Sequence, residues 1–331
     1  MDVQASRAYT GEAWIQTVTG RISPRELGWC QCHEHLLIAR GKPFEVHASL
    51  YMEDLEKAVE ELQLYKAAGG CSLVDAQPAG CGRMARGLIS LSNRSGVHIV
   101  ASTGFHKLIF YPEDHWIHTL SGEQLTALFT GELEQGLFAD GDRELPRTRL
   151  SARAGLIKAA LDAQGLSGRY LTLFKAAAEA AVETGAPLMC HIEKGADAPG
   201  LIRFLTAAGV HPGSVILCHL DRAEGDLEVH RQVARAGVFL EYDTISRPKY
   251  HDDRQEIAIL RQMLQWGFGG QMLLSLDTTR ERLQSYGGKP GLDYIATGFR
   301  QRLREDGVPE KEIRAMMVGN PQKALAFRRG K

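Results

Sequence analysis

Eight short apolar segments recur along the 331 residues, and helix-like stretches lie between them. Each segment has the length of a strand and is too uniformly apolar for a sheet with one face in water. Strands that alternate with helices at this spacing form parallel sheets. The eight segments are LGWCQCHEH (27–35), SLVDAQP (72–78), HIVASTGF (98–105), AGLIKAAL (154–161), APLMCHIE (186–193), SVILCHLD (214–221), VFLEYDT (238–244) and MLLSLDT (272–278).

Three of the intervening stretches, 52–70, 168–187 and 253–270, have helical periodicity and run into glycines. Eight strands predict an α/β protein, a closed (β/α)8 TIM barrel that fills residues 1–331 as a single domain. An open doubly wound sheet is the main alternative. No glycine-rich fingerprint follows the first segment, which argues against a dinucleotide-binding version of that sheet.

The longest connection, 106–153, joins the third and fourth predicted strands. Within it, Ser121 and Gln124 have the spacing of a capping box ahead of a helical pattern. We therefore expect the barrel to carry a short N-terminal extension and a long loop and helix insertion at 106–153.

The charge balance argues against some partners. The 39 Lys and Arg residues are matched by 40 Asp and Glu residues, so there is no basic excess for nucleic acid. No apolar run has transmembrane length, and the first residues lack the apolar core of a signal peptide. We predict a cytoplasmic protein that binds neither nucleic acid nor membranes, with its six cysteines reduced.

Metal-ligating residue types end several predicted strands. His33 and His35 end the first, His191 the fifth, His219 the sixth and Asp277 the eighth. In a barrel, the C-terminal ends of the strands converge on one site. Because side chains alternate along a strand, His33 and His35 face the same way and could bind one divalent cation. His191 and His219 could bind a second, with Asp277 as an oxygen ligand or a base.

Each of these residues also has an ordinary structural explanation. A histidine at a strand end is more often a hydrogen-bonded polar residue, and Asp277 could cap a helix. Lys158, within the fourth segment, could reach toward water. A metal site is favoured because all of these explanations would have to hold at once.

Three cysteines directly precede predicted histidine ligands and are a competing set of zinc ligands. They are Cys32, Cys190 and Cys218. Strand alternation predicts that each points away from the face its histidine uses, toward the surrounding helices.

The motifs CHEHL, STGF, LIKAA, MCHIEKG, LCHLDR, LSLDTTR and VGNPQKALAF, in this order, closely resemble the phosphotriesterase-like family of the amidohydrolase superfamily. The resemblance covers nearly the whole chain. It implies that His33, His35 and Asp277 bind the more buried of two metal ions, and that His191 and His219 bind the more exposed one. It also implies that Lys158 is carbamylated by carbon dioxide and bridges the two ions. Burial within its apolar segment would favour the neutral amine that carbamylation needs.

The same resemblance implies a metal-dependent hydrolase of lactones, carboxylic esters or phosphotriesters. A hydroxide that bridges the metals would attack the substrate, and Asp277 would carry the proton to the leaving oxygen. Asp277 and Lys158 are then the catalytic residues. Zinc is the expected metal, and Mn, Co or Fe would also suit these ligands.

Basic residues follow the seventh and eighth predicted strands, where barrel enzymes commonly bind a substrate phosphate. The cluster resembles that of the family subgroup that hydrolyses phosphorylated sugar lactones. We therefore predict a lactonase that opens a phosphorylated pentono-lactone, with a homodimer as the default assembly. The candidate phosphate-binding residues are Arg247, Lys249, Tyr250, Arg280 and Arg282.

Alternatives stay open at this point. Some of the basic residues could be solvated loop charges, paired with Glu281, Asp252 or Asp253. The enzyme could hydrolyse unphosphorylated lactones or esters, with promiscuous phosphotriesterase activity. The chain could also be a ligand-binding member of the fold without catalysis. A single-metal deaminase is disfavoured because it would leave Lys158 without a purpose.

Overall fold

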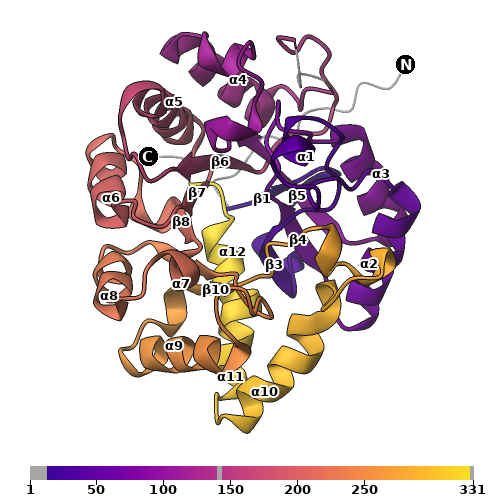
Figure 1. Cartoon of the computed structure of the whole chain (residues 1–331), viewed down its shortest axis with the longest axis vertical. Helices are drawn as coiled ribbons and strands as arrows, with labels where there is room; N and C mark the ends of the chain where they lie inside the picture. Colours follow the sequence, from indigo (N-terminus) through magenta and orange to yellow (C-terminus); the bar gives the residue numbers. More distant parts are fainter. Residues whose placement is uncertain (1–12, 140–143, 329–331) are drawn as a thin grey trace.

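A computed structural model describes residues 13–139 and 144–328, in which eight parallel strands form a barrel surrounded by helices (Figure 1). Each strand is hydrogen-bonded to the next one along the chain, which is the order of a barrel and not of a doubly wound sheet. The barrel prediction is confirmed, because every predicted segment contains one of these strands. They are β3 (Cys30–Glu34), β4 (Ser72–Asp75), β5 (His98–Gly104), β6 (Leu156–Leu161), β7 (Leu188–Ile192), β8 (Val215–Cys218), β9 (Phe239–Tyr242) and β10 (Met272–Leu274).

Helices follow the strands and cover the outside of the barrel (Figure 1). The predicted helical stretches 52–70, 168–187 and 253–270 contain α2, α5 and α9. α5 ends at Gly185, whose φ of 74° is the left-handed conformation that glycine adopts without strain. The α-helices are α1 (Lys42–Val46), α2 (Leu55–Ala67), α3 (Ala85–Ser95), α4 (Gly122–Glu134), α5 (Gly168–Thr184), α6 (Ala198–Ala207), α7 (Leu220–Ala223), α8 (Leu227–Arg235), α9 (Asp253–Gln265), α10 (Arg300–Glu305), α11 (Glu310–Arg314) and α12 (Asn320–Ala324).

The segment between β5 and β6 contains α4. Its helix begins with the expected capping box: Ser121 N donates to Gln124 Oε1 at 2.9 Å, and Gln124 N donates to Ser121 Oγ at 3.2 Å. A hairpin of β1 (Ile15–Thr17) and β2 (Gly20–Ile22), which was not predicted, precedes the barrel. Residues 1–12, in which part of the expected N-terminal extension falls, and residues 140–143 of the insertion lie outside the described residues.

The apolar core has two layers. Met189, Ile216 and Phe239 are register partners on adjacent strands and belong to the inner layer, inside the barrel. Ala324 and Leu325 at the end of α12 pack on the same inner layer. The other face of each strand packs against the helices and forms the larger outer layer. No helix of the described residues is long and apolar enough to cross a membrane.

Side chains join the first and last barrel strands, β3 and β10. The Glu34 carboxylate accepts hydrogen bonds from Leu276 N at 2.8 Å and Thr278 N at 3.1 Å. His33 contributes twice: its N–H donates to Ser275 Oγ at 2.9 Å, and its carbonyl accepts from Asp277 N at 3.1 Å. These bonds hold the end of β3 beside the segment that follows β10, so the C-terminal ends of the two strands meet.

A buried ion pair fastens the insertion to the barrel. Arg83 Nη1 donates to Glu132 Oε2 at 3.0 Å, and Nη2 of the same guanidinium contacts Oε1. Arg83 also donates to the carbonyls of Ser102 and Phe138 at 2.8 and 2.9 Å. Both side chains are almost completely excluded from water, so removing one partner would leave a buried charge unpaired.

We therefore expect Arg83→Met to lower the free energy of unfolding by about 3–5 kcal/mol, because Glu132 would remain buried without its partner. Urea denaturation followed by circular dichroism measures this. Arg94→Met is the control, since Arg94 pairs with Glu56 in the same two-pronged way on the surface and should matter little. Equal effects of the two substitutions would contradict the anchoring role of Arg83.

Candidate metal centre

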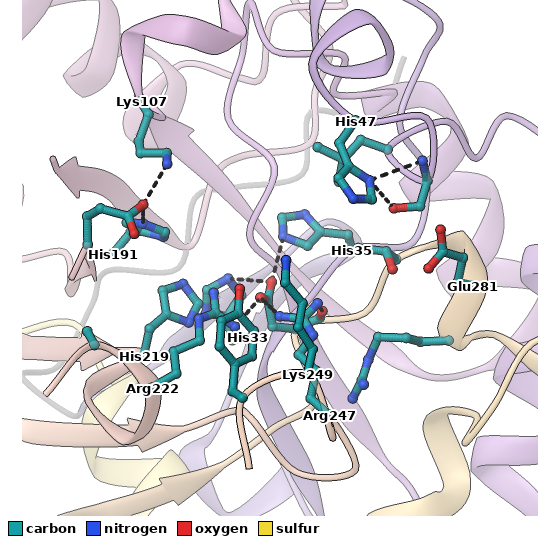
Figure 2. Close-up of a pocket in the computed structure, with 18 of the residues that line it drawn as sticks. His33, His35, His47, Lys107, His191, His219, Arg222, Arg247, Lys249 and Glu281 are labelled. Atoms are coloured by element: carbon teal, nitrogen blue, oxygen red, sulfur yellow. Dashed lines mark hydrogen bonds and ion pairs between the residues drawn. The ribbon is translucent and has the colours of Figure 1, made fainter. Parts of the chain in front are cut away.

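A cavity of about 910 Å³ opens where the C-terminal ends of the barrel strands meet. Five of the six predicted ligands line it, namely His33, His35, His191, His219 and Asp277, while the sixth, Lys158, is fully buried behind them against His33. Figure 2 shows the histidines gathered near the middle of the cavity. Segments that are up to 244 residues apart in the chain therefore contribute to one site, as the barrel prediction requires.

His33, His35, Asp277 and Lys158 form one compact group. Asp277 Oδ1 lies 3.6 Å from His33 Nε2 and 3.3 Å from His35 Nε2. Lys158 Nζ lies 3.1 Å from His33 Nε2, from β6 at the base of the cavity. The two β3 histidines thus face the same way, as strand alternation predicts, while Glu34 between them binds the β10 side of the barrel.

His219 and Asp277 have unusual backbone conformations. Their φ angles are 72° and 50°, in the left-handed region that non-glycine residues rarely adopt. Both follow the ends of strands, β8 and β10, where the chain must turn away from the barrel. Such strain is retained where surrounding structure enforces it, and it is often found at functional sites.

Asp243, directly after β9, contacts both His219 and His33 through its carboxylate. Its Oδ1 lies 2.6 Å from His219 Nδ1 and its Oδ2 lies 3.2 Å from His33 Nδ1. If both Nδ1 atoms donate to Asp243, both Nε2 atoms are left as acceptors, which is the form that binds a metal. Sequence reasoning missed Asp243. The signal was available, because Asp243 ends the seventh predicted strand as Asp277 ends the eighth.

His191 lies on the other side of His219, with ring centres 4.4 Å apart. Its Nε2 is 3.4 Å from Glu193 Oε2, and the same oxygen is 2.6 Å from Lys107 Nζ. Nδ1 of His191 is therefore the nitrogen left for a metal. The sequence assigned no role to Lys107 or Glu193, since their loops follow different strands and only the folded chain brings them together.

The imidazoles of His33, His191 and His219 are held neutral. Burial and the Lys158 ammonium lower the pKa of His33 to about 4. Burial also lowers the pKa of His191 to about 4, and burial with Arg222 lowers the pKa of His219. A neutral imidazole is the form that ligates metals, so no proton has to leave these rings on binding at neutral pH.

Asp277 is held ionised by two arginines. Burial alone would raise the pKa of Asp277, but the guanidiniums of Arg247 and Arg222 outweigh it and hold the pKa well below its usual value. Arg247 Nη1 lies 2.7 Å and Arg222 Nη1 lies 2.9 Å from Asp277 Oδ2. Oδ1 remains directed at His33 and His35, so the two oxygens have separate surroundings.

This donor set fits metal ions. Donors at about 2.0–2.1 Å from one tetrahedral zinc ion lie about 3.3 Å apart, close to the spacing of the His33, His35 and Asp277 donor atoms. Lys158 is fully buried, and among the described residues no carboxylate lies within ion-pair distance of its Nζ. A buried ammonium ion without a counter-charge is costly, so this position is compatible with the carbamylation that the family resemblance implies for Lys158.

The predicted direction of two cysteines is wrong. Cys218 is the register partner of His191 and therefore faces the barrel interior with it. Alternation would turn Cys218 and His219 in opposite directions. The left-handed backbone at His219 breaks this alternation, so both side chains point toward the barrel interior. Cys190 does pack in the outer layer, as predicted.

Cys32 also belongs to the inner layer, with Cys218. The pairing of β3 with β4 shifts register between Gln31 and Glu34, so simple alternation fails there. Burial raises the pKa of the Cys32 and Cys218 thiols, which disfavours the thiolate that binds zinc. Their role as packing residues is thus compatible with their inward direction.

The five candidate phosphate-binding residues differ in whether they line the cavity. Arg247, Lys249 and Tyr250 line the cavity on the loop after β9. Arg282 also lines it, but its guanidinium donates to the carbonyls of Ile245 and Ser246. Arg280 does not line the cavity.

The structure places Arg280 differently from the prediction. Its side chain is exposed, and its guanidinium carbon lies 5.5 Å from the ring centre of Tyr286. A short 3₁₀ turn (Arg280–Arg282) separates the directions of its two arginines, so proximity in sequence did not place both in the cavity. Arg222, which the sequence did not single out, lines the cavity instead, 5.2 Å from the ring centre of Tyr250.

Comparison with known proteins bears on this geometry. The sequence pattern that defines the phosphotriesterase family matches residues 13–325 of this chain. The phospho-furanose lactonase of Mycoplasmopsis synoviae is 28% identical over 95% of this chain and 92% of its own length. Two crystal structures are similar in fold. An amidohydrolase from Mycoplasma synoviae has a TM-score of 0.91 at 26% identity, covering 97% of this chain and 94% of its own. A lactonase from Listeria monocytogenes has a TM-score of 0.86 at 28% identity, covering 96% and 100%.

The position of Asp243 makes a testable prediction for metal affinity. Asparagine would keep one oxygen but place an NH2 group where the second carboxylate oxygen now faces an imidazole Nδ1 atom. We expect Asp243→Asn to weaken metal binding about 10–100-fold, as loss of an orienting carboxylate generally does. Competition with a zinc-binding dye measures the affinity. Asp306→Asn, on the exposed turn after α10, should bind metal as the wild type does, and unchanged affinity in the Asp243 variant would refute the orienting role.

Proposed function

This chain belongs to the phosphotriesterase family, and from that membership we propose that it is a binuclear metal-dependent lactonase that opens a phosphorylated pentono-lactone. The observation that carries the proposal is the shared cavity. Four imidazoles and an ionised carboxylate, with the buried Lys158 against His33, lie beside a wall of arginine and lysine. Known lactonases among its relatives support the reaction class.

Two divalent ions would be held by the predicted ligands, with zinc as the first candidate and Mn, Co or Fe as alternatives. His33, His35 and Asp277 would hold one ion, His191 and His219 the other, and carbamylated Lys158 both. When bound, such ions activate water at neutral pH and polarise a carbonyl oxygen.

The protein residues then orient and move the proton. Asp277, ionised and fixed by Arg222 and Arg247, is the acceptor for the proton of the attacking water and returns it to the ring oxygen that leaves. Asp243 fixes the rings of His33 and His219. Opening the ring produces a carboxylate, so the product is a phosphorylated sugar acid.

Removal of metal gives a direct test of catalysis. Dialysis against a chelator should abolish lactone hydrolysis, and zinc or manganese should restore it, because the bound ions would activate the water and polarise the lactone carbonyl. Hydrolysis is followed by proton release, and metal content by mass spectrometry. A fully metal-loaded protein that opens no lactone would support the alternative of a ligand-binding protein without catalysis.

We propose that the substrate phosphate binds Arg247, Lys249 and Tyr250, with Arg222 behind them. Lys249 is exposed at the cavity wall, and among residues 13–139 and 144–328 no carboxylate lies within ion-pair distance of it. Its charge is therefore available to an incoming anion. Arg282 supports the loop through its bonds to Ile245 and Ser246, and Arg280 takes no part.

Lys249→Met should raise KM for a phosphorylated pentono-lactone about 10-fold and leave the unphosphorylated lactone unaffected, because only the phosphate contact is lost. Steady-state kinetics with both substrates measures this. Arg280→Met is the matched control on the neighbouring loop and should change neither. An equal effect of Lys249→Met on both substrates, or a wild type that prefers the unphosphorylated lactone, would favour the alternative of a neutral lactone or ester hydrolase.

A further inference from the structure

The wall of the cavity that carries Lys107 and Glu193 has no part in the function proposed so far. Lys107 belongs to the loop after β5, and Glu193 directly follows β7. Lys107 Nζ and Glu193 Oε2 are 2.6 Å apart, and both residues line the cavity. In Figure 2, Lys107 lies across the histidine cluster from Lys249 and Arg247. A charged pair thus stands opposite the basic wall.

The two walls differ in charge. Lys107 is neutralised by Glu193, whereas on the other side the three cations Arg222, Arg247 and Lys249 outnumber the two carboxylates, Asp277 and Asp243, that lie within ion-pair distance of the arginines. A phosphate is attracted to the wall with excess positive charge. The Lys107–Glu193 pair has no net charge, but it presents a strong donor beside a strong acceptor. This combination suits a hydroxyl group, which accepts one hydrogen bond and donates another.

Both members of the pair retain free bonding capacity. Glu193 contacts Lys107 and His191 through Oε2 and accepts from Lys194 N through Oε1, out of about four acceptor positions on a carboxylate. The Lys107 ammonium uses one of its three donors on Glu193. Both side chains are partly exposed to the cavity, 21% for Lys107 and 34% for Glu193, so a ligand can reach them.

The chemistry of a five-membered sugar lactone places a hydroxyl there. The carbonyl carbon C1 is bonded to the ring oxygen on one side and to C2 on the other. The ring oxygen leads to C4, which carries C5 and its phosphate, whereas C2 carries a hydroxyl group. With the phosphate at Lys249 and the carbonyl at the histidines, C2 faces the opposite wall.

We propose that the Lys107–Glu193 ion pair binds the C2 hydroxyl of the lactone and makes the enzyme selective for hydroxylated over deoxygenated lactones. The inference rests on the proposed function, because it assumes that the carbonyl lies at the histidines. A site built to bond a hydroxyl rejects the analogue without it, since the polar groups of the site then lose water without gaining a partner. Alkyl lactones are disfavoured for the same reason.

The experiment pairs a protein change with a substrate change. Phosphorylated pentono-lactones of both C2 configurations and the 2-deoxy compound are compared with wild type, Glu193→Gln and Lys107→Met. We expect the wild type to prefer one 2-hydroxy lactone over the 2-deoxy lactone by about 10–100-fold in kcat/KM. Each variant should lose most of this preference by slowing the 2-hydroxy substrate far more than the 2-deoxy one. Glu60→Gln and Lys175→Met, exposed on α2 and α5, are controls that should keep it.

A purely structural role of Glu193, as an orienting partner of His191, has a different signature. Glu193→Gln would then lower metal content and slow both substrates by the same factor, and the inference would be overturned. A wild type that treats 2-hydroxy and 2-deoxy lactones alike would also overturn it, while leaving the proposed lactonase function intact.

Binding without turnover separates the inference from the proposed function. The 1,4-anhydropentitol 5-phosphates keep the ring, hydroxyls and phosphate but have no carbonyl to attack, and calorimetry compares them with their 2-deoxy forms. Tighter binding of a hydroxylated form, lost in Glu193→Gln, supports the ion pair even if no lactone is opened. If neither lactones are opened nor these analogues bound, the inference and the proposed function both fail.

Discussion

The candidate site depends on the closure of the barrel between its first and last strands. The Glu34 carboxylate binds two backbone N–H groups of the segment after β10, and the backbone of His33 contributes two further bonds. This pairing sets Asp277 beside the histidines that flank Glu34. Within the His-Glu-His motif, Glu34 therefore closes the barrel while His33 and His35 face the cavity. The same three residues thus serve both the fold and the candidate site.

The two sides of the cavity differ in the charged groups that they carry. Neutral imidazoles occupy the centre because burial disfavours their protonated forms. The two arginines keep Asp277 ionised on one side, and Glu193 neutralises Lys107 on the other. A ligand that enters the cavity meets imidazole nitrogens between an anion-attracting wall and the Lys107–Glu193 ion pair. Such an arrangement selects both the charge and the orientation of what it binds.

The sequence predicted the eight strands, the barrel and the residues that gather in the cavity, because buried strands and their ends have a strong local pattern. It failed where the backbone departs from that pattern. The left-handed turn at His219 and the register shift in β3 turned Cys218 and Cys32 inward. Alternation along an ideal strand cannot anticipate either feature.

Contacts between distant loops were also beyond the sequence. The end of the seventh predicted strand could have pointed to Asp243, but its contact with His219, like that of Arg222 with Asp277, could be found only once the strands were placed side by side. The direction of Arg280 depended on a short turn whose geometry has no clear sequence signal. The confirmed predictions are thus those that rest on periodicity, and the missed features depend on side-chain direction and tertiary contact.

The left-handed backbone at His219 and Asp277 has a consequence for attempts to stabilise this protein. Glycine adopts such φ angles without the penalty that a Cβ atom imposes. A design procedure that ranked positions by local strain alone would therefore choose these two among its first glycine replacements. Such replacements would relieve backbone strain, but they would erase a nitrogen and an oxygen donor, and the loss of Asp277 would also leave Arg222 and Arg247 without their carboxylate partner. Stabilising substitutions are better placed in the helices that surround the barrel, with His219 and Asp277 left unchanged.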